Sequence, residues 1–410
     1  MGLYARGMTG DSLAVGQRSL GDPEVRYPLW PPALGGDPAT STEDVAYPVE
    51  VDYDYGRVPA DLFGRDAPGR VDRWAALLPP LTTPGLGEGG TPLVEVEDAV
   101  FVKDESRNPT WSHKDRLNRC TVSAAVGVGA RGVVVASSGN HGASAAAYSA
   151  RAGLPCVVLT SAAVPPAVAS FLAAYGAVVL PVPVEARWGL TRRIVEEYGF
   201  HPVSNLGVTH TGHPFGPEGY KTVAYEIHAD LGVPEAVFVP TGYGELLFGV
   251  WKGFAELRRL GVTTEVPRLF SCEPAAGGPL HRAVSRGLPA TWIEPGDTDA
   301  YSIGCPVNGY RGVHALRESR GEPLLVTDEE MRRAQTALAG RGLWAELSSA
   351  AAYAGYRQVR DSGRSFDGPV VCVSTSSGFK DIAVAAHRPQ PVDPAWPEVQ
   401  AHLAKAGITP

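Results

Sequence analysis

Residues 108–119 read Asn-Pro-Thr-Trp-Ser-His-Lys-Asp-Arg-Leu-Asn-Arg, and they decide the interpretation of the rest of the chain. An extended segment, residues 99–103, precedes this stretch and an Ala-rich helical segment follows it, so Lys114 is predicted to lie where a loop becomes a helix. A lysine held there can reach into a cleft. If the cleft holds an aldehyde cofactor, the amine forms a Schiff base and later transfers protons. The alternative is a solvated lysine in a charged turn.

An alternation of short apolar runs and helical stretches follows. The apolar runs, rich in β-branched residues, are residues 133–135, 157–159, 178–182, 237–239, 269–272 and 370–373. The helical stretches between them include residues 140–150, 167–175, 191–197, 219–230 and 246–259. Strand–helix alternation of this kind predicts an α/β fold with parallel sheets covered by helices.

The composition excludes several classes of function. The chain has 410 residues and a formal net charge of −8, with no long basic run, so a nucleic-acid role has little support. No apolar run reaches the roughly 18 residues needed to cross a bilayer, so no membrane role is expected. The five cysteines form no Cys-x-x-Cys pair, which argues against a zinc site or a disulfide framework. Cys156 and Cys372 lie in apolar runs and are expected to be buried and reduced, which predicts a cytoplasmic protein.

Residues 1–90 differ from the rest because they are rich in Gly, Pro and acidic residues and show weak periodicity. We interpret them as an N-terminal extension with a strand at residues 48–53 and a Trp-bearing helix at residues 70–78, docked on the main body. A Pro-rich tail begins at residue 389 and is expected to end in a short helix.

Residues 135–142 read Val-Ala-Ser-Ser-Gly-Asn-His-Gly, a strand that runs into a helix start. Ser137, Ser138 and the backbone amides there form a small anion site suited to a carboxylate. Asn140 can donate to a phenolic oxygen such as that of a pyridoxal ring. An ordinary capped helix start is the alternative, with His141 as a packed histidine.

Two more strand ends carry polar groups. Residues 238–249 read Phe-Val-Pro-Thr-Gly-Tyr-Gly-Glu-Leu-Leu-Phe-Gly, a glycine turn whose amides can close on a phosphate at a helix start. Glu245 is awkward there unless its side chain points away, because a carboxylate repels a phosphate. Residues 371–381 place hydroxyls after a strand, where they can face a ring nitrogen; an ordinary polar turn is the alternative.

In this order the stretches resemble the threonine synthase family of fold-type-II pyridoxal-phosphate enzymes. The resemblance runs from residue 48 to residue 385 through Val49-Glu-Val-Asp-Tyr-Asp-Tyr, Gly87-Glu-Gly-Gly-Thr-Pro-Leu-Val, Lys103-Asp-Glu-Ser-x-Asn-Pro-Thr-x-Ser-His-Lys-Asp-Arg, Ser138-Gly-Asn, Glu218-Gly-Tyr-Lys-Thr, Gly304-x-Pro-Val, Arg317-Glu-Ser-x-Gly, Glu346-Leu-Ser-Ser-Ala-Ala-Ala and Thr375-Ser-Ser-Gly-Phe-Lys-Asp. It implies a homodimer of two-domain chains, like the tryptophan synthase β-subunit. It implies a large cofactor domain formed by residues 91–130 and 229–390 and a small domain formed by residues 131–228. Residues 1–90 are then the N-terminal extension and residues 391–410 the C-terminal tail.

The resemblance also assigns residues to the cofactor, pyridoxal 5'-phosphate. Lys114 matches the Schiff-base lysine, and Asn140 matches the donor to the ring oxygen. The phosphate loop is matched by Thr241, Gly242, Tyr243 and Gly244. Thr375 matches the residue that faces the ring nitrogen. A hydroxyl there cannot supply a proton as a carboxylate does, which favours expulsion of a leaving group over transamination.

Departures from the family pattern concern the substrate. Residues 210–217 read His-Thr-Gly-His-Pro-Phe-Gly-Pro, with Gly216 where an arginine of the phosphohomoserine site is expected. Losing a bidentate guanidinium from a phosphate site is not conservative. We therefore expect a lyase or replacement enzyme acting on an amino acid with a different β- or γ-leaving group, which His113, His141, His210 and His213 contact. The alternatives are structural histidines, a genuine threonine synthase, an ammonia-lyase or dehydratase, and a non-catalytic relative.

Overall fold

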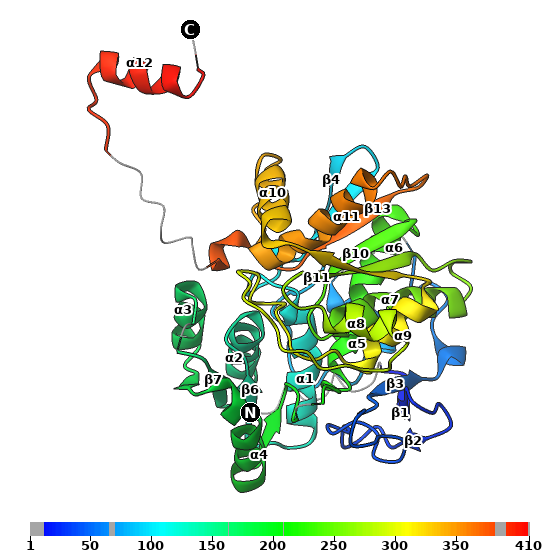
Figure 1. The fold of residues 1–410 in the computed structure, drawn as a ribbon. Helices are drawn as coiled ribbons and strands as arrows, with labels where there is room; N and C mark the ends of the chain where they lie inside the picture. Colours follow the sequence, from blue (N-terminus) through cyan, green and yellow to red (C-terminus); the bar gives the residue numbers. More distant parts are fainter. Residues whose placement is uncertain (1–11, 65–69, 163, 208, 382–390, 409–410) are drawn as a thin grey trace.

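The chain contains three β-sheets in a computed structural model that describes residues 12–64, 70–162, 164–207, 209–381 and 391–408. Figure 1 shows the two larger sheets, each flanked by helices, with the N-terminal strands at one side of the molecule. The α/β class expected from the alternating sequence is therefore confirmed, with antiparallel pairs in addition to the parallel ones.

The largest sheet has six strands in the order β12-β11-β10-β13-β5-β4, all parallel except β4. In chain order they are β4 (Leu93–Glu97), β5 (Val100–Asp104), β10 (Ala236–Pro240), β11 (Arg268–Pro274), β12 (Glu322–Val326) and β13 (Val370–Ser374). Val237 and Val239 enter one core and Ala236 and Phe238 the other. This alternation explains the continuous apolar runs, because a strand covered on both faces has no exposed side.

Helices cover both faces of this sheet. On one face lie α5 (Gly216–Tyr220), α6 (Thr222–Leu231), α7 (Glu245–Arg259), α8 (Pro279–Ser285) and α9 (Tyr310–Glu318). On the other lie α10 (Asp328–Ala339) and α11 (Ala351–Asp361). The stretch predicted as one helix over residues 219–230 is thus two helices that meet at Lys221.

The second sheet has four parallel strands in the order β8-β7-β6-β9. Its elements are β6 (Gly132–Ala136), α2 (Asn140–Ala152), β7 (Cys156–Thr160), α3 (Pro166–Ala174), β8 (Val178–Pro181), α4 (Arg187–Tyr198) and β9 (Phe200–Pro202). Helix α1 (Lys114–Gly127) joins the sheets, since Leu117 packs in the core of the first and Val122 in the core of the second. The proposed domain division stays a prediction.

The N-terminal region forms a small antiparallel sheet of β1 (Ala14–Ser19), β2 (Arg26–Tyr27) and β3 (Val49–Tyr53). β3 is the predicted strand, whereas β1 was not predicted. The helix predicted over residues 70–78 is instead the 3₁₀ helix η2 (Val71–Leu77), because Trp74 departs from helical geometry with φ −94° and ψ 17°. Trp74 is nevertheless buried in the core beside α6, as docking of this region requires.

The tail ends in α12 (Trp396–Lys405), which stands apart from the other elements in Figure 1. Its residues are almost all exposed. Within the described part of the chain, α12 and the other helices are all too short or too polar to span a lipid bilayer.

Candidate active site

Three of the predicted site segments follow strands whose carboxyl ends lie at one edge of the large sheet. β5, β13 and β10 are parallel neighbours, and they lead to Lys114, Thr375 and the 241–244 loop. The amide of His113 donates to the carbonyl of Thr375 at 3.0 Å, which ties the first two segments together. Such an edge is where open α/β sheets bind their ligands.

Lys114 is the first residue of α1, as predicted, and its side chain is half-buried. Its Nζ lies 2.9 Å from the hydroxyl of Tyr220. Gly219 allows this approach, because a side chain there would collide with the backbone of Arg116 in α1. Burial lowers the pKa of Lys114, and the charge of Glu245 opposes the shift only in part. An amine with a lowered pKa is suited to act as a nucleophile and a base.

Asn140 is the first residue of α2, and both the nitrogen and the oxygen of its side-chain amide are hydrogen-bonded. Its Nδ2 donates to Glu346 Oε2 at 2.8 Å, and its Oδ1 accepts from Lys380 Nζ at 2.8 Å. These contacts fix which end of the amide is the donor. One N–H of Nδ2 remains for a ligand oxygen. Sequence reasoning assigned no role to Glu346 or Lys380, although both lie in motifs that carried the resemblance.

The hydroxyl of Thr375 belongs to a hydrogen-bond chain. The amide of Ser376 donates to Ser349 Oγ at 2.8 Å, and Ser349 Oγ lies 2.8 Å from Thr375 Oγ1. Ser349 can use its own proton toward Thr375 while it accepts from the amide. Thr375 then keeps its proton for a ligand, so its hydroxyl can donate to an unprotonated ring nitrogen.

The 241–244 loop has the shape of an anion cradle. Gly244 has φ +88° and packs against Gly312, and a Cβ at Gly242 would lie 2.8 Å from Cys305 Sγ. Phe248 is the first residue of α7 whose amide bonds a loop or helix carbonyl, that of Gly244 at 3.0 Å. The earlier amides at this helix start therefore remain for an anion such as a phosphate.

Glu245 turns its side chain away from the loop and toward Gly212. Gly212 has φ +64°, and the Glu245 carboxylate occupies the space that a side chain there would need. Oε1 of Glu245 is buried and has no hydrogen-bond partner within the described residues, while Oε2 lies 4.0 Å from His210 Nε2. Burial raises the pKa of Glu245, and the charges of Arg311 and Lys114 oppose that rise.

The predicted histidines lie in the same region, His210 and His213 buried and His113 and His141 half-buried. His113 stacks on Tyr220 with ring centroids 5.2 Å apart, and His210 stacks on Tyr243 at 4.1 Å. Burial lowers the pKa of His113, His141 and His210, and the charge of Lys114 adds to the effect in all three. The structure therefore brings these three histidines around Lys114.

His213 is paired instead with His201, which sequence reasoning did not single out. Their Nε2 atoms lie 2.9 Å apart, and the amide of Phe215 donates to His213 Nδ1 at 3.0 Å. A neutral His213 that accepts at Nδ1 carries its proton on Nε2 and donates it to His201. His201 lies in β9 with no sequence signal of a role.

Ser137 and Ser138 follow β6 and precede Asn140, but their hydroxyls have protein partners. Ser137 Oγ accepts from the amide of Gly139 at 3.2 Å. Ser138 Oγ accepts from Arg187 Nη2 at 2.9 Å and from the amide of Ser161 at 2.9 Å. Arg187, which the sequence did not point to, is therefore a cation directly beside the predicted carboxylate site.

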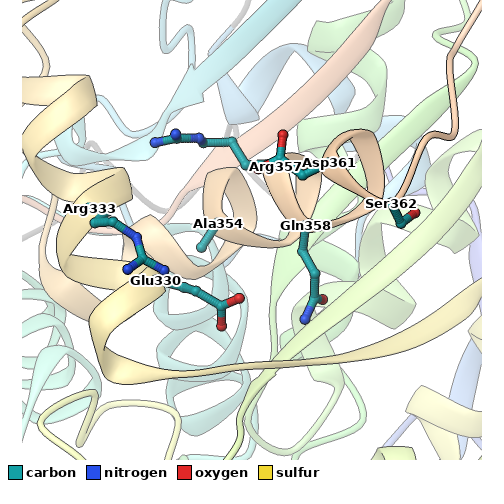
Figure 2. Close-up of a pocket in the computed structure, with 7 residues that line it drawn as sticks. All are labelled: Glu330, Arg333, Ala354, Arg357, Gln358, Asp361 and Ser362. Atoms are coloured by element: carbon teal, nitrogen blue, oxygen red, sulfur yellow. The ribbon is translucent and has the colours of Figure 1, made fainter.

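Of two cavities in the described part of the chain, one lies away from this cluster and the other touches it. One of about 300 Å³ lies between α10 and α11 (Figure 2), contains none of the predicted site residues, and is lined by Glu330, Arg333, Ala354, Arg357, Gln358, Asp361 and Ser362. The other, of about 120 Å³, includes His210 in its wall and reaches Asp44 and Trp292. The second cavity adjoins the Lys114 region through His210.

The histidines with lowered pKa values predict acid lability. The pKa values of His141 and His210 are lowered by burial to about 3, against 6.5 when exposed. Below pH 6.5 these histidines are protonated in the unfolded chain but stay neutral in the folded chain. The free energy of unfolding therefore falls as the pH falls from 6.5 toward 3. At pH 5 the loss amounts to at most about 2 kcal/mol per histidine. Urea midpoints at pH 7 and pH 5 should differ less in the His141→Gln/His210→Gln double variant than in the wild type. The exposed His402→Gln variant serves as the control and should behave like the wild type.

The sequence matches a known family. A profile described as "Pyridoxal-phosphate dependent enzyme" covers residues 85–376. A threonine synthase from Methanosarcina acetivorans is 33% identical over 354 residues, which are 81% of this chain and 86% of that protein. The chain belongs to the threonine synthase-like family of pyridoxal-phosphate dependent enzymes. A threonine synthase from Halalkalibacterium halodurans is 36% identical over 316 residues, which are 74% of this threonine synthase-like chain and 85% of that protein.

Solved structures support the fold. Processed threonine deaminase isoform 2 from Solanum lycopersicum has a TM-score of 0.63 at 19% identity, covering 72% of this chain and 81% of its own. Maize serine racemase has a TM-score of 0.62 at 18% identity, and the match covers 77% of this chain and 93% of the racemase. The cofactor of the family is pyridoxal phosphate, and the residues present suit it. They provide a half-buried amine, a free amide N–H, a free hydroxyl and an open helix start.

Proposed function

We propose that this threonine synthase-like enzyme is a pyridoxal-phosphate-dependent lyase or replacement enzyme whose amino-acid substrate carries a β- or γ-leaving group other than phosphate. The observation that supports the catalytic part is the half-buried Lys114 amine, with its lowered pKa and its hydrogen bond to Tyr220, at a helix start that is tied to Thr375 through His113. Bound pyridoxal phosphate supplies an electron-withdrawing ring that acidifies the α-proton of an attached amino acid.

Different residues of the site transfer the proton, hold the cofactor and bind the substrate. Lys114 removes the α-proton, and the Tyr220 hydroxyl at 2.9 Å orients its amine. Asn140 and Thr375 hold the oxygen and the nitrogen of the ring, and the 241–244 loop holds the phosphate. Ser137, Ser138 and the nearby Arg187 bind the substrate carboxylate.

The charges near Lys114 disfavour an anionic leaving group. Gly216 is buried, and a Cβ there would lie 3.1 Å from the Leu117 side chain, so no cation occupies the position where the family has arginine. Arg311 is a nearby cation, but its Nη atoms donate to the carbonyls of Thr211 and Val49. The Glu245 carboxylate has one oxygen unpaired, and the surrounding histidines are neutral. An uncharged leaving group, such as a hydroxyl, suits these surroundings better than a phosphate.

A substrate panel tests this proposal. Purified enzyme loaded with pyridoxal phosphate is incubated separately with serine, threonine, homoserine and O-phosphohomoserine, and release of ammonia, oxo acid, threonine and phosphate is measured. We expect kcat/KM for an unphosphorylated amino acid to exceed that for O-phosphohomoserine. If O-phosphohomoserine is converted to threonine more efficiently than the other substrates are consumed, the enzyme is a genuine threonine synthase. The identity to threonine synthases favours that second candidate.

Replacing Glu245 tests the role of charge. Glu245→Gln removes a buried carboxylate but keeps its size, so a phosphorylated ligand should bind more tightly. We expect the Ki of O-phosphohomoserine, measured at saturating cofactor, to fall about tenfold, corresponding to roughly 1.4 kcal/mol. Glu294→Gln makes the same charge change at an exposed position and should leave Ki unchanged. An unchanged Ki in Glu245→Gln would show that the substrate does not reach this carboxylate.

The expected homodimer and the cytoplasmic location stay predictions. The amino-acid substrate follows from the proposed function and is tested by the same panel.

A further inference from the structure

Exposed aromatic side chains gather at one place on the body of the protein. Trp111, Phe171, Trp344 and Phe379 form a chain of ring contacts that we call the aromatic patch. The distance between ring centroids is 5.2 Å for Trp111 and Phe171 and 5.8 Å for Trp111 and Phe379. It is 4.7 Å for Trp344 and Phe379. Trp111, Trp344 and Phe379 remain 41%, 43% and 56% exposed. Clusters of exposed apolar groups of this kind mark interaction sites.

The backbone holds the patch open to solvent. Trp111 has φ +62°, a left-handed conformation that a bulky residue rarely adopts. Its carbonyl accepts from Ser376 Oγ at 3.0 Å and from the amide of Ser377 at 3.3 Å. A strained conformation persists only where the surrounding structure enforces it, and strain of this kind is typical of functional segments.

The patch joins a helix beside the four-stranded sheet to segments that carry site residues. Trp111 comes three residues before Lys114, and Phe171 belongs to α3 beside the four-stranded sheet. Trp344 lies two residues before Glu346, and Phe379 directly precedes Lys380; both Glu346 and Lys380 hold Asn140. A segment that covered the patch would thus hold α3 against the segments that position the site.

Helix α12 has the complementary surface. Trp396, Val399 and Leu403 recur at helical spacing on one face, and Trp396 and Leu403 are 63% and 37% exposed. Isolated helices shorter than about 12–15 residues are marginal in water even with favourable sequences. A helix of 10 residues with its apolar face exposed therefore needs a surface to bind.

The chain connects the two surfaces. Phe379 lies two residues before Asp381, and α12 begins at residue 396. The 15 peptide units from Asp381 to Trp396 span up to about 50 Å when extended, which is ample to return α12 to the patch. A short tether also makes the local concentration of α12 at its own patch millimolar in order of magnitude.

We propose that α12 docks on the aromatic patch of its own chain, with Trp396 and Leu403 against the patch rings. The docked helix bridges α3 and the segment before Lys114. Binding of this kind follows the helix-in-groove mode, in which an apolar helical stripe supplies the anchors.

Hydrogen exchange of the full-length enzyme tests the proposal. We expect the amides of residues 399–405 to exchange at least about tenfold more slowly than in an unstructured chain. The Trp396→Ala/Leu403→Ala variant, which removes the apolar stripe, should lose that protection. The Phe379→Ala variant, which removes a patch ring, should lose it too. Glu398→Ala and Lys405→Ala change exposed residues on the opposite face of the same helix and should keep it. Absent protection in the wild type, or protection that survives in Phe379→Ala, would overturn the proposal.

A mixing experiment separates docking within a chain from docking between copies. The Phe379→Ala chain has an intact α12 and the Trp396→Ala/Leu403→Ala chain has an intact patch. The two are unfolded together and refolded as a mixture. If α12 binds its own chain, neither partner regains protection. Recovery of protection in the α12 of the Phe379→Ala chain would mean docking on a second copy and would overturn the proposal as stated.

Discussion

Lys114→Ala is expected to reduce kcat/KM by at least about 10³-fold for the best amino-acid substrate. The substitution removes the amine that is proposed both to bind the cofactor and to move the α-proton, and no neighbouring group replaces it. The nearby Arg187 and Arg311 cannot deprotonate in a protein. Lys380 donates to the carbonyl of Thr110 and to Asn140 Oδ1. His113, His141 and His210 are not attached to the cofactor. Steady-state kinetics measure the loss, and the visible absorbance of the loaded protein should change because the covalent attachment is absent.

Tyr220→Phe is the matched variant. It keeps the ring that stacks on His113 and removes the hydroxyl 2.9 Å from Lys114 Nζ. We expect it to retain bound cofactor and the absorbance of the wild type, with a shifted pH profile of kcat because the amine loses a hydrogen-bond partner. Activity of Lys114→Ala within tenfold of the wild type would refute the assignment of Lys114. Absorbance that is identical in the wild type and Lys114→Ala would favour a non-catalytic relative.

The sequence predicted the site best where local pattern determined position. Lys114 had to lie at the start of a helix, because an extended run precedes it and an Ala-rich stretch follows. The structure places Lys114 at the start of α1, as predicted. Thr375 was assigned to the cofactor only through the resemblance; in the structure its strand, β13, is the parallel neighbour of β5, so both segments leave the same edge of the sheet. The roles of both residues toward the cofactor stay proposals.

Contacts between distant segments could not be predicted in this way. The hydrogen bond from Asn140 to Glu346 crosses 206 positions in the sequence. The His201–His213 pair joins a strand to a loop, and neither residue carries a local mark of its partner. β1 was missed because its sequence, Ala-Val-Gly-Gln-Arg-Ser, has polar residues at positions that the fold buries. In each case the tertiary environment, rather than propensity, determines the result.

Glu245 illustrates the value of a local conflict. A carboxylate in a phosphate-binding turn contradicts the expected chemistry unless it faces elsewhere, and the structure turns it toward Gly212 and His210. Conflicts between local chemistry and the expected role tend to mark functional sites. The sequence could identify the conflict, but the direction of the side chain required the fold.

Arg116→Leu is expected to destabilise the protein by about 3–5 kcal/mol, the cost of breaking a buried ion pair from one side. Arg116 follows Lys114 by two residues and is completely buried. Its Nε lies 2.7 Å from Glu105 Oε2, and its Nη1 lies 2.6 Å from Glu226 Oε1. Burial alone would raise the pKa of Glu226, yet Arg116 and Lys103 hold it at about 2. Both carboxylates lose a buried partner in the variant, and the midpoint of urea unfolding at pH 7 measures the loss.

Two controls separate the buried network from charge in general. Arg107→Ala removes an arginine of the same segment whose side chain is 65% exposed and pairs with Asp104 at 3.1 Å; such exposed pairs contribute only about 0–1 kcal/mol. Arg116→Lys keeps the charge but cannot bridge both carboxylates with a planar fork, so its stability should fall between that of Arg116→Leu and the wild type. If Arg116→Leu were no less stable than Arg107→Ala, the network would not stabilise the fold. The position of Lys114, two residues earlier on the same helix, would then depend on the packing of Leu117 and Gly219 alone.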